Sequence, residues 1–260
     1  MANRTALVTG ASSGIGAVYA DRLARRGHDL VLVARDKSKL QATAARLRSE
    51  TGVAVELLPA DLTDPVERGN VELRLQEDGR IGILINNAGT TVPGGFSNPD
   101  LDSLDKLIRL NVTAVTRLAA AVAPRFAVEG EGAIVNVASV LALAPEVFHG
   151  IYPATKAFVL TLSQSLQAEL GPRGVYVQAV LPGATRTEIW THAGRDVNTI
   201  PGVMEVGELV DAALIGFDRR EPVTIPPLPD AAQWDAFSGA RMAMLPNFSQ
   251  SHAAARYRAP

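Results

Sequence analysis

The sequence has no cysteine, few aromatic residues and almost no excess of either charge. Without cysteine among its 260 residues, disulfide bonds and cysteine metal ligands are excluded. Its 25 Lys and Arg residues nearly balance 27 Asp and Glu residues, so there is no basic excess for binding the phosphate backbone of a nucleic acid. With 47% hydrophobic residues and 5% aromatic ones, the composition indicates a soluble globular protein.

A long uninterrupted apolar run is also missing. Arg117 interrupts the longest apolar region, around 110–128, and strand-forming residues already begin at Thr5. We therefore expect neither a membrane-spanning helix nor a secretion leader, and we predict a cytoplasmic protein without a membrane partner. The histidines are too dispersed for a metal site: they are His28, His149, His192 and His252.

Strand-like and helix-like segments alternate along the chain, which predicts a parallel sheet with helices on both faces. The predicted strands are 5–8, 30–34, 54–58, 81–86, 133–138, 175–180 and 222–225. The predicted helices are 15–26, 37–50, 65–77, 101–128, 152–170 and 205–218. Right-handed crossovers give a doubly wound, Rossmann-type α/β fold of about seven strands, with ligands at the carboxyl ends of the strands. Residues 1–260 suffice for one domain, and the prolines from Pro222 to Pro229 predict a C-terminal tail over 226–260 with a short helix.

A glycine-rich turn follows the first predicted strand. Its residues are Thr9, Gly10, Ala11, Ser12, Ser13, Gly14, Ile15 and Gly16. A strand, a glycine-rich turn and a helix N-terminus make an anion site, because glycines let backbone amides approach a pyrophosphate. The spacing G-x-x-x-G-x-G differs from the common G-x-G-x-x-G fingerprint, and a purely structural turn is the alternative. The strand–turn–helix context favours nucleotide binding.

Tyr152 and Lys156 stand four residues apart at the start of a predicted helix, and Ser139 precedes them. On a helix this spacing puts both side chains on one face, about 6 Å apart. At an effective dielectric constant of about 20, a lysine ammonium there favours the phenolate by about 3 kcal/mol. We therefore expect Lys156 to lower the phenol pKa by roughly two pKa units, so that Tyr152 exchanges protons while Ser139 holds a substrate oxygen. The alternative is an ordinary surface tyrosine and lysine one helical turn apart.

These motifs, with the residues between them, resemble the short-chain dehydrogenase/reductase family in its single-domain branch. The similarity spans roughly residues 3–225. It consists of T-G-x-x-x-G-x-G at 9–16, Asp61, N-N-A-G at 86–89, Asn111, Ser139, Y-x-x-x-K at 152–156, and Pro182-Gly183 with Thr187. The ordered set is far more specific than any single motif in it.

The resemblance implies a catalytic group and a cofactor site. The implied catalytic residues are Asn111, Ser139, Tyr152 and Lys156. The implied cofactor-binding residues are Gly10, Ser12, Ser13, Gly14, Ile15, Gly16, Arg35, Asp61, Leu62, Asn87, Ala88, Gly89, Tyr152, Lys156, Pro182, Gly183, Thr185 and Thr187. Asn111 is expected to hold a water that links Lys156 to solvent, since asparagine is otherwise unfavourable in an apolar helix. Asp61 is expected at the adenine edge, and a cap of the helix 65–77 is the alternative.

The same resemblance implies a mobile substrate lid after the Pro-Gly turn, expected over residues 188–204. The expected pocket residues are Leu141, His149, Trp190 and His192. Simple solvent exposure is the alternative for His149. The helices at 101–128 and 152–170 commonly pair across a two-fold axis in this family, so we expect a homodimer or a homotetramer.

The end of the second strand bears on the choice of cofactor. It reads Ala34-Arg35, whereas an acidic residue there would accept hydrogen bonds from the adenine ribose and repel a 2′-phosphate. The guanidinium of Arg35 suits phosphate recognition, so the sequence favours NADPH over NADH. Stacking on the adenine, or exposure to solvent, is the alternative role of Arg35. Ser13 departs from a family pattern with a basic residue in the glycine loop, which places more of the preference on Arg35.

We therefore predict an NADPH-dependent carbonyl reductase, reversible as an alcohol dehydrogenase, that acts on a small-molecule carbonyl or alcohol. Tyr152 is the general acid and base. The alternative is a nucleotide-binding regulator of the same fold that has lost catalysis. All four members of the catalytic group are present, which disfavours it. An epimerase or dehydratase of the longer family branch is also disfavoured, because those enzymes normally need a further substrate domain and 260 residues leave little room for one.

Overall fold

The computed structural model describes residues 4–97 and 99–258. Within them, seven parallel strands form one sheet in the order β3-β2-β1-β4-β5-β6-β7. The strands are β1 Thr5–Thr9, β2 Leu30–Ala34, β3 Val55–Pro59, β4 Ile81–Asn86, β5 Ala133–Val137, β6 Tyr176–Val180 and β7 Val223–Thr224. The helices are α1 Gly14–Arg25, α2 Lys37–Thr51, α3 Pro65–Glu77, α4 Leu101–Ile108, α5 Val115–Glu129, α6 Tyr152–Leu170, α7 Ile189–His192, α8 Val206–Asp218 and α9 Ala231–Ala243. The predicted doubly wound α/β fold is confirmed.

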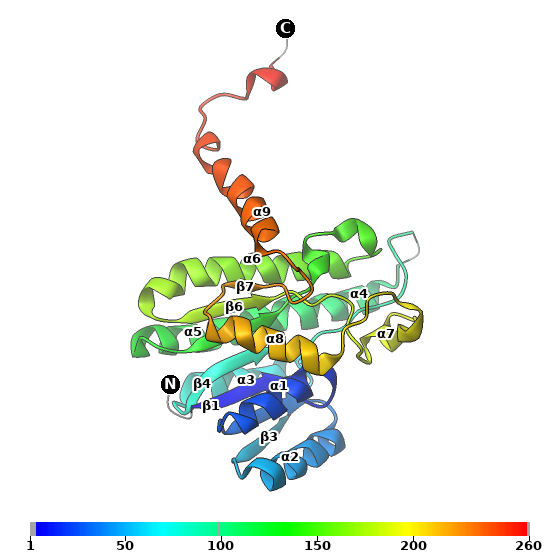
Figure 1. The fold of residues 1–260 in the computed structure, drawn as a ribbon, viewed down its shortest axis with the longest axis vertical. Helices are drawn as coiled ribbons and strands as arrows, with labels where there is room; N and C mark the ends of the chain where they lie inside the picture. The colour runs from blue at the N-terminus through cyan, green and yellow to red at the C-terminus, as the bar shows by residue number, and fades with distance from the viewer. Residues whose placement is uncertain (1–3, 98, 259–260) are drawn as a thin grey trace. The chain divides into compact units, whose positions relative to one another are not determined.

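Alternate residues of each central strand supply two separate cores. In β1, Ala6 and Val8 belong to the core under α1, α2 and α8, whereas Leu7 belongs to the core under α3, α5 and α6. Figure 1 shows helices on the two faces of the sheet. Because both faces are covered, the strands read as continuous apolar runs, which is why the sequence revealed them.

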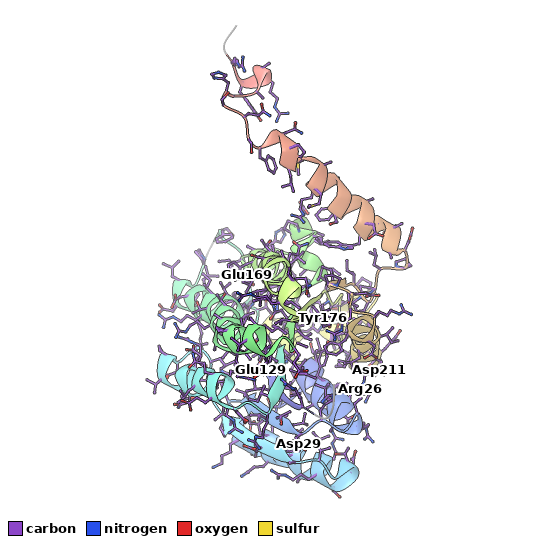
Figure 2. All side chains as sticks on the ribbon, turned by 90° about the vertical axis from the view of Figure 1, so that its left-hand side faces the viewer. Arg26, Asp29, Glu129, Glu169, Tyr176 and Asp211 are labelled. Atoms are coloured by element: carbon purple, nitrogen blue, oxygen red, sulfur yellow. The ribbon has the colours of Figure 1, made fainter. Side chains whose placement is uncertain are left out.

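The strand order reverses beside β1, and this reversal positions the site. The chain runs outward from β1 to β3, then returns to β4 and continues outward to β7. In such sheets the crevice between the two diverging halves lies at the carboxyl ends of the strands. Ion pairs join the helices that meet near the reversal: Arg22 contacts Asp211 at 2.6 Å, and Arg26 contacts Asp218 at 2.8 Å. Figure 2 labels Arg26, the residue directly after α1, and Asp211 of α8.

The predicted helix 101–128 is interrupted in the structure. Residues Arg109–Ala114 form a π-helical turn between α4 and α5. The whole run, Leu101–Glu129, is long and apolar enough to cross a membrane by length and composition alone, and half of its apolar window is buried inside the fold. Leu118, Val122 and Phe126 of α5 pack into the core on one face of the sheet, as in a core helix of an α/β protein.

The described chain divides into two compact units, one ending at Pro226 and the other beginning at Pro227. The second unit holds α9, capped by the Asp230 carboxylate on the amide of Ala232. None of its described residues is buried. Its exposed large apolar side chains are Phe237, Met242, Met244, Leu245, Phe248 and Tyr257. A unit this small cannot bury an apolar core of its own.

Candidate active site

A cleft of about 1160 Å³ opens at the carboxyl ends of the strands. Its walls come from the glycine loop after β1, the ends of β2 and β3, the turn after β4, the segments after β5 and β6, and the start of α6. It is lined by most of the predicted site residues: Gly10, Ser12, Ser13, Gly14, Ile15, Arg35, Asp61, Leu62, Asn87, Ala88, Gly89, Ser139, Leu141, Tyr152, Lys156, Pro182, Gly183, Thr185, Thr187, Trp190 and His192. Gly16, Asn111 and His149 are not among its lining residues.

The glycine loop brings its backbone unusually close to neighbouring atoms. A Cβ on Gly16 would lie 2.3 Å from the carbonyl oxygen of Gly10, and a Cβ on Gly14 would lie 3.3 Å from Cγ2 of Thr187. Gly10 and Gly14 also have φ values of +65° and +52°, which L side chains rarely adopt. Glycine is therefore required at these positions. Gly16 does not line the cleft itself, but it lets α1 pack closely against the glycine loop.

Helix α1 starts in the cleft without a side-chain cap. Ser13 occupies the N-cap position but makes no capping hydrogen bond, and the first turn carries no acidic residue. By contrast, the carboxylates of Asp36 and Asp64 cap α2 and α3. Uncapped amides at a helix N-terminus, with the positive end of the helix dipole, form an anion site. The start of α1 therefore fits the pyrophosphate of a dinucleotide.

The Asn87 turn is fastened to the end of β1. Oγ1 of Thr9 accepts hydrogen bonds from the amides of Asn87 and Ala88, both at 3.0 Å, and Nδ2 of Asn87 donates to the carbonyl of Thr9 at 2.9 Å. These bonds hold the turn after β4 against the glycine loop. Asn87 thus has a structural role beside the one the resemblance implies.

The Ser139, Tyr152 and Lys156 side chains come together where β5 and α6 meet the cleft. Ser139 follows β5 and is buried, and its hydrogen bond with the Tyr152 phenol lowers the pKa of that phenol. Helix α6 begins at Tyr152, with Pro153 in its first turn, where the missing amide hydrogen costs nothing. Nζ of Lys156 donates to the carbonyl of Val137 at 2.8 Å and lies 5.7 Å from the centroid of the Tyr152 ring. The group has a proton donor, a second hydroxyl and a cation within one small volume.

The expectation that Lys156 lowers the pKa of Tyr152 is wrong for this arrangement. Burial raises the pKa of the Tyr152 phenol above its ordinary value, and the hydrogen bond from Ser139 opposes that rise only in part. The ammonium is directed to the carbonyl of Val137, and burial lowers the pKa of Lys156 itself to about 8. Removing water from both groups outweighs their mutual attraction. Tyr152 is therefore a neutral proton donor at physiological pH.

Asn111 lies in the π-helical turn, directly behind the cleft wall. Its Oδ1 accepts from the amide of Thr90 at 2.9 Å, and its Nδ2 donates to the carbonyl of Thr90 at 2.9 Å and to Oγ1 of Thr155 at 3.2 Å. A Cβ on Gly89 would lie 3.3 Å from Asn111 Oδ1 and 3.5 Å from Lys156 Nζ, so the two side chains flank this glycine. The relay water that the resemblance implies stays a prediction.

The end of β2 presents positive charge to the cleft. Arg35 and Lys39 both line it. Asp36 lies between them, but its carboxylate accepts from the Lys39 amide at 3.0 Å and from the Ser38 hydroxyl at 2.7 Å, so it is directed to the start of α2. Because Asp36 Oδ1 is occupied by these two bonds, this oxygen is not available to pair with the Arg35 guanidinium in place of a phosphate. The Asp36 cap and Lys39 were missed from the sequence, although an acid directly before a helical pattern is a known cap signal.

Asp61 is placed beside this positive region. Burial raises its pKa, but hydrogen bonds from Thr63 and the charges of Arg35 and Lys106 outweigh burial and lower it overall. Its Oδ1 accepts from the amide and the hydroxyl of Thr63, whereas the cap of α3 is Asp64. The structure therefore excludes the alternative that Asp61 caps the helix 65–77.

The opposite end of the cleft is mostly apolar. Leu141, Trp190 and His192 line it, as do Phe148 and Ile189. The indole Nε1 of Trp190 donates to the carbonyl of Thr185 at 2.8 Å, which fixes the ring.

His149 is not part of this wall. It is exposed and does not line the cleft, which corrects its assignment to the pocket. Phe148 takes that place instead, with its ring 5.8 Å from the ring of Tyr152. The loop before α6 turns its aromatic side chain toward the cleft and the neighbouring imidazole outward, and no periodicity in a loop predicts which of two adjacent residues faces inward. Among the described residues no cluster of His, Cys, Asp or Glu could hold a metal ion.

Comparisons with known proteins agree with this geometry. A model of the short chain dehydrogenase family matches residues 4–198. The chain belongs to the short-chain dehydrogenase/reductase family. A short-chain dehydrogenase from Sphingobium yanoikuyae, solved in complex with NADPH, is 66% identical, with a TM-score of 0.96 over 98% of this chain and 100% of that one. A bulky-bulky ketone specific alcohol dehydrogenase from Comamonas testosteroni is 57% identical, with a TM-score of 0.92 over 98% of this chain and 99% of that one.

Some curated relatives are longer proteins than this chain. The very-long-chain 3-oxoacyl-CoA reductase of Anas platyrhynchos is 36% identical over 191 residues, which are 71% of this chain. The match spans 60% of the length of that reductase. The similarity to that reductase therefore concerns only the part of it that this chain matches.

Proposed function

We propose that this short-chain dehydrogenase is an NADPH-dependent carbonyl reductase that also runs in reverse as an alcohol dehydrogenase. The observation that carries the proposal is the shared cleft. It joins an uncapped helix N-terminus, a positive end of β2, and the group of Ser139, Tyr152 and Lys156. A dinucleotide bound along the cleft fits the first two features, and a carbonyl substrate fits the third.

The protein residues then divide the chemistry between them. When bound, the reduced nicotinamide supplies a hydride to the carbonyl carbon. Tyr152 gives its phenol proton to the carbonyl oxygen, so that C=O becomes CH–OH. Ser139 orients that oxygen, Lys156 holds the cofactor ribose and returns a proton to Tyr152, and Asn111 holds the relay water. Because burial raises the pKa of Tyr152, its phenol is protonated at neutral pH, which is the form that the reduction requires.

The substrate proposed first for testing is a ketone with bulky apolar groups. The wall near Tyr152 includes Leu141, Phe148, Ile189 and Trp190. The alcohol dehydrogenase from Comamonas testosteroni, 57% identical, is specific for bulky-bulky ketones. We propose that residues 188–204 close this wall as a substrate lid.

A panel of ketones, keto esters and sugars tests the function, read as the consumption of NADPH. We expect ketones flanked by two bulky apolar groups to be reduced fastest. A catalytically silent regulator would reduce none of them while still binding NADPH. No observation favours that second candidate, since all four predicted catalytic residues are present.

We also propose that the enzyme is a cytoplasmic homodimer or homotetramer with residues 1–260 as one catalytic domain and 226–260 as its tail. The support is the exposed apolar surface: Phe158 of α6 is 40% exposed, and the second unit exposes six large apolar side chains while none of its residues in 227–258 is buried. A second copy of the chain would cover such surfaces. Light scattering at micromolar concentration should give a multiple of 27.5 kDa, and a monomer would contradict the proposal.

A further inference from the structure

A carboxylate from the segment after β6 bridges two other walls of the cleft. Oε2 of Glu188 accepts from Oγ of Ser13 in the glycine loop at 3.0 Å. Its Oε1 lies 3.2 Å from Nζ of Lys39 on α2. All three residues line the cleft. We call this three-residue contact the Glu188 clasp.

The clasp places a tethered anion in the region that the proposed function gives to phosphate. Ser13 stands at the uncapped start of α1, and Lys39, in the first turn of α2, follows Arg35 by four residues and lines the same cleft. The hydrogen bond from Lys39, and after it that from Ser13, lowers the pKa of Glu188, so the carboxylate is ionised at neutral pH. The Asp36 carboxylate caps α2 by accepting from the backbone amide of Lys39, whereas the Lys39 ammonium pairs with Glu188.

We propose that Lys39 is a second cation of the 2′-phosphate site and that Glu188 competes with the 2′-phosphate for it. This inference rests on the proposed function, and it names residues that set the cofactor preference beyond Arg35. A phosphate monoester carries nearly twice the charge of a carboxylate at pH 7, so Lys39 and Ser13 exchange Glu188 for the phosphate when NADPH binds. A cofactor without the 2′-phosphate leaves the clasp intact.

A different role of the Glu188 clasp, as a strap over the bound cofactor, makes a different prediction. If the clasp closed over the cofactor as a strap, breaking it would weaken binding of every adenine dinucleotide, with or without the 2′-phosphate. Competition predicts tighter binding on removal of the Glu188 charge, and only for ligands that carry the 2′-phosphate. Whether removal of the Glu188 charge tightens or weakens the binding of a ligand with a 2′-phosphate therefore separates competition from a strap.

The experiment is calorimetric titration of the full chain with adenosine 2′,5′-bisphosphate and with AMP, which avoids any dependence on turnover. Lys39→Met should weaken the bisphosphate by about 10-fold, as expected for loss of a charge-assisted contact. Glu188→Gln should tighten it by about 2- to 5-fold, the size of an exposed ion pair. Neither substitution should alter the affinity for AMP. In the Lys39→Met background, Glu188→Gln should give a smaller gain than in the wild type, because its competitor role depends on Lys39.

Two matched controls remove the same charges elsewhere. Lys37→Met changes an exposed lysine of α2 outside the cleft, and Glu169→Gln changes an exposed glutamate of α6 (Figure 2). Neither should alter the affinity for the bisphosphate. If Glu188→Gln weakens the bisphosphate and AMP alike, or if Lys39→Met equals Lys37→Met, the inference is overturned while NADPH-dependent reduction by the wild type still supports the proposed function. If the wild type binds neither the bisphosphate nor NADPH, the proposed function fails together with the inference.

Discussion

Lys156 carries a cost in stability that a single substitution should reveal. The residue is 5% exposed, and burial lowers its pKa from 10.5 to about 8. In the unfolded chain the ammonium is fully hydrated, whereas in the folded enzyme without cofactor it has one hydrogen bond, to the carbonyl of Val137. Lys156→Met keeps most of the side-chain length and removes the charge. We expect the variant to be more stable than the wild type, although it loses activity.

The magnitude follows from the pKa difference. At about 1.4 kcal/mol per pKa unit, a shift from 10.5 to about 8 costs the wild type about 3 kcal/mol at pH 7. Loss of the bond to Val137 offsets about 1 kcal/mol, so the net gain is about 2 kcal/mol. For a domain of this size that raises the melting temperature by about 4–8 °C.

The pH dependence has a definite sign. Below pH 8 Lys156 is charged in both states, and the full cost is present. Between pH 8 and 10.5 the folded state loses its proton first, so the unfolded state binds more protons and the stability of the wild type rises with pH. The advantage of Lys156→Met should therefore shrink from about 2 kcal/mol at pH 7 to below about 1 kcal/mol at pH 9.5.

Chemical unfolding of the enzyme without cofactor, at several pH values, measures this difference. Lys37→Met, an exposed lysine outside the cleft, is the control and should leave stability nearly unchanged at every pH. A Lys156→Met variant that is less stable than the wild type at pH 7, or a difference that does not change with pH, would refute the reasoning. Added NADPH should stabilise the wild type more than the variant, because the ammonium serves cofactor binding as well as catalysis.

Three further predictions concern the site. Tyr152→Phe removes the proton donor and keeps the ring, so turnover should fall by about 10²–10⁴-fold with little change in the dissociation constant of NADPH; near-normal turnover would contradict the role of Tyr152. Arg35→Ala should raise the Michaelis constant for NADPH by roughly 10- to 150-fold and leave that for NADH unchanged, and equal use of both cofactors by the wild type would speak against it. Gly14→Val should abolish cofactor binding in calorimetry, because φ is +52° and the new Cβ would meet Thr187 at 3.3 Å; retained affinity would show that the loop adapts.

The fold could be predicted because its signals are local and repeated. Strands such as β1 and β4 are buried on both faces, so they appear as continuous apolar runs between turn residues. The glycines of the turn after β1 could be predicted because the backbone there lies too close to neighbouring atoms to leave room for a side chain. The π-helical turn at Arg109–Ala114 could not be predicted in this way. It adds one residue to a helical turn, and the apolar pattern of the helix continues across it.

Contacts between distant segments account for the other omissions. Glu188 and Ser13 are 175 residues apart, and Glu188 and Lys39 are 149 apart, so no spacing in the sequence joins them. Phe148 and His149 are neighbours in an irregular loop, where only the folded backbone decides which side chain enters the cleft. Side chains on regular elements could be placed from the sequence, whereas those on loops required the structure.

The pKa of Tyr152 shows how a correct pairing can still give the wrong electrostatics. The i, i+4 spacing correctly puts Lys156 beside Tyr152, and an attraction of about 3 kcal/mol follows if both remain near water. The spacing contains no information on burial, and burial acts on both groups at once, raising one pKa and lowering the other. With the ammonium drawn to the carbonyl of Val137, the attraction loses to desolvation and the phenol keeps its proton. The same residues therefore give a phenol that keeps its proton in the enzyme without cofactor, the state in which it can protonate the oxygen of a carbonyl substrate.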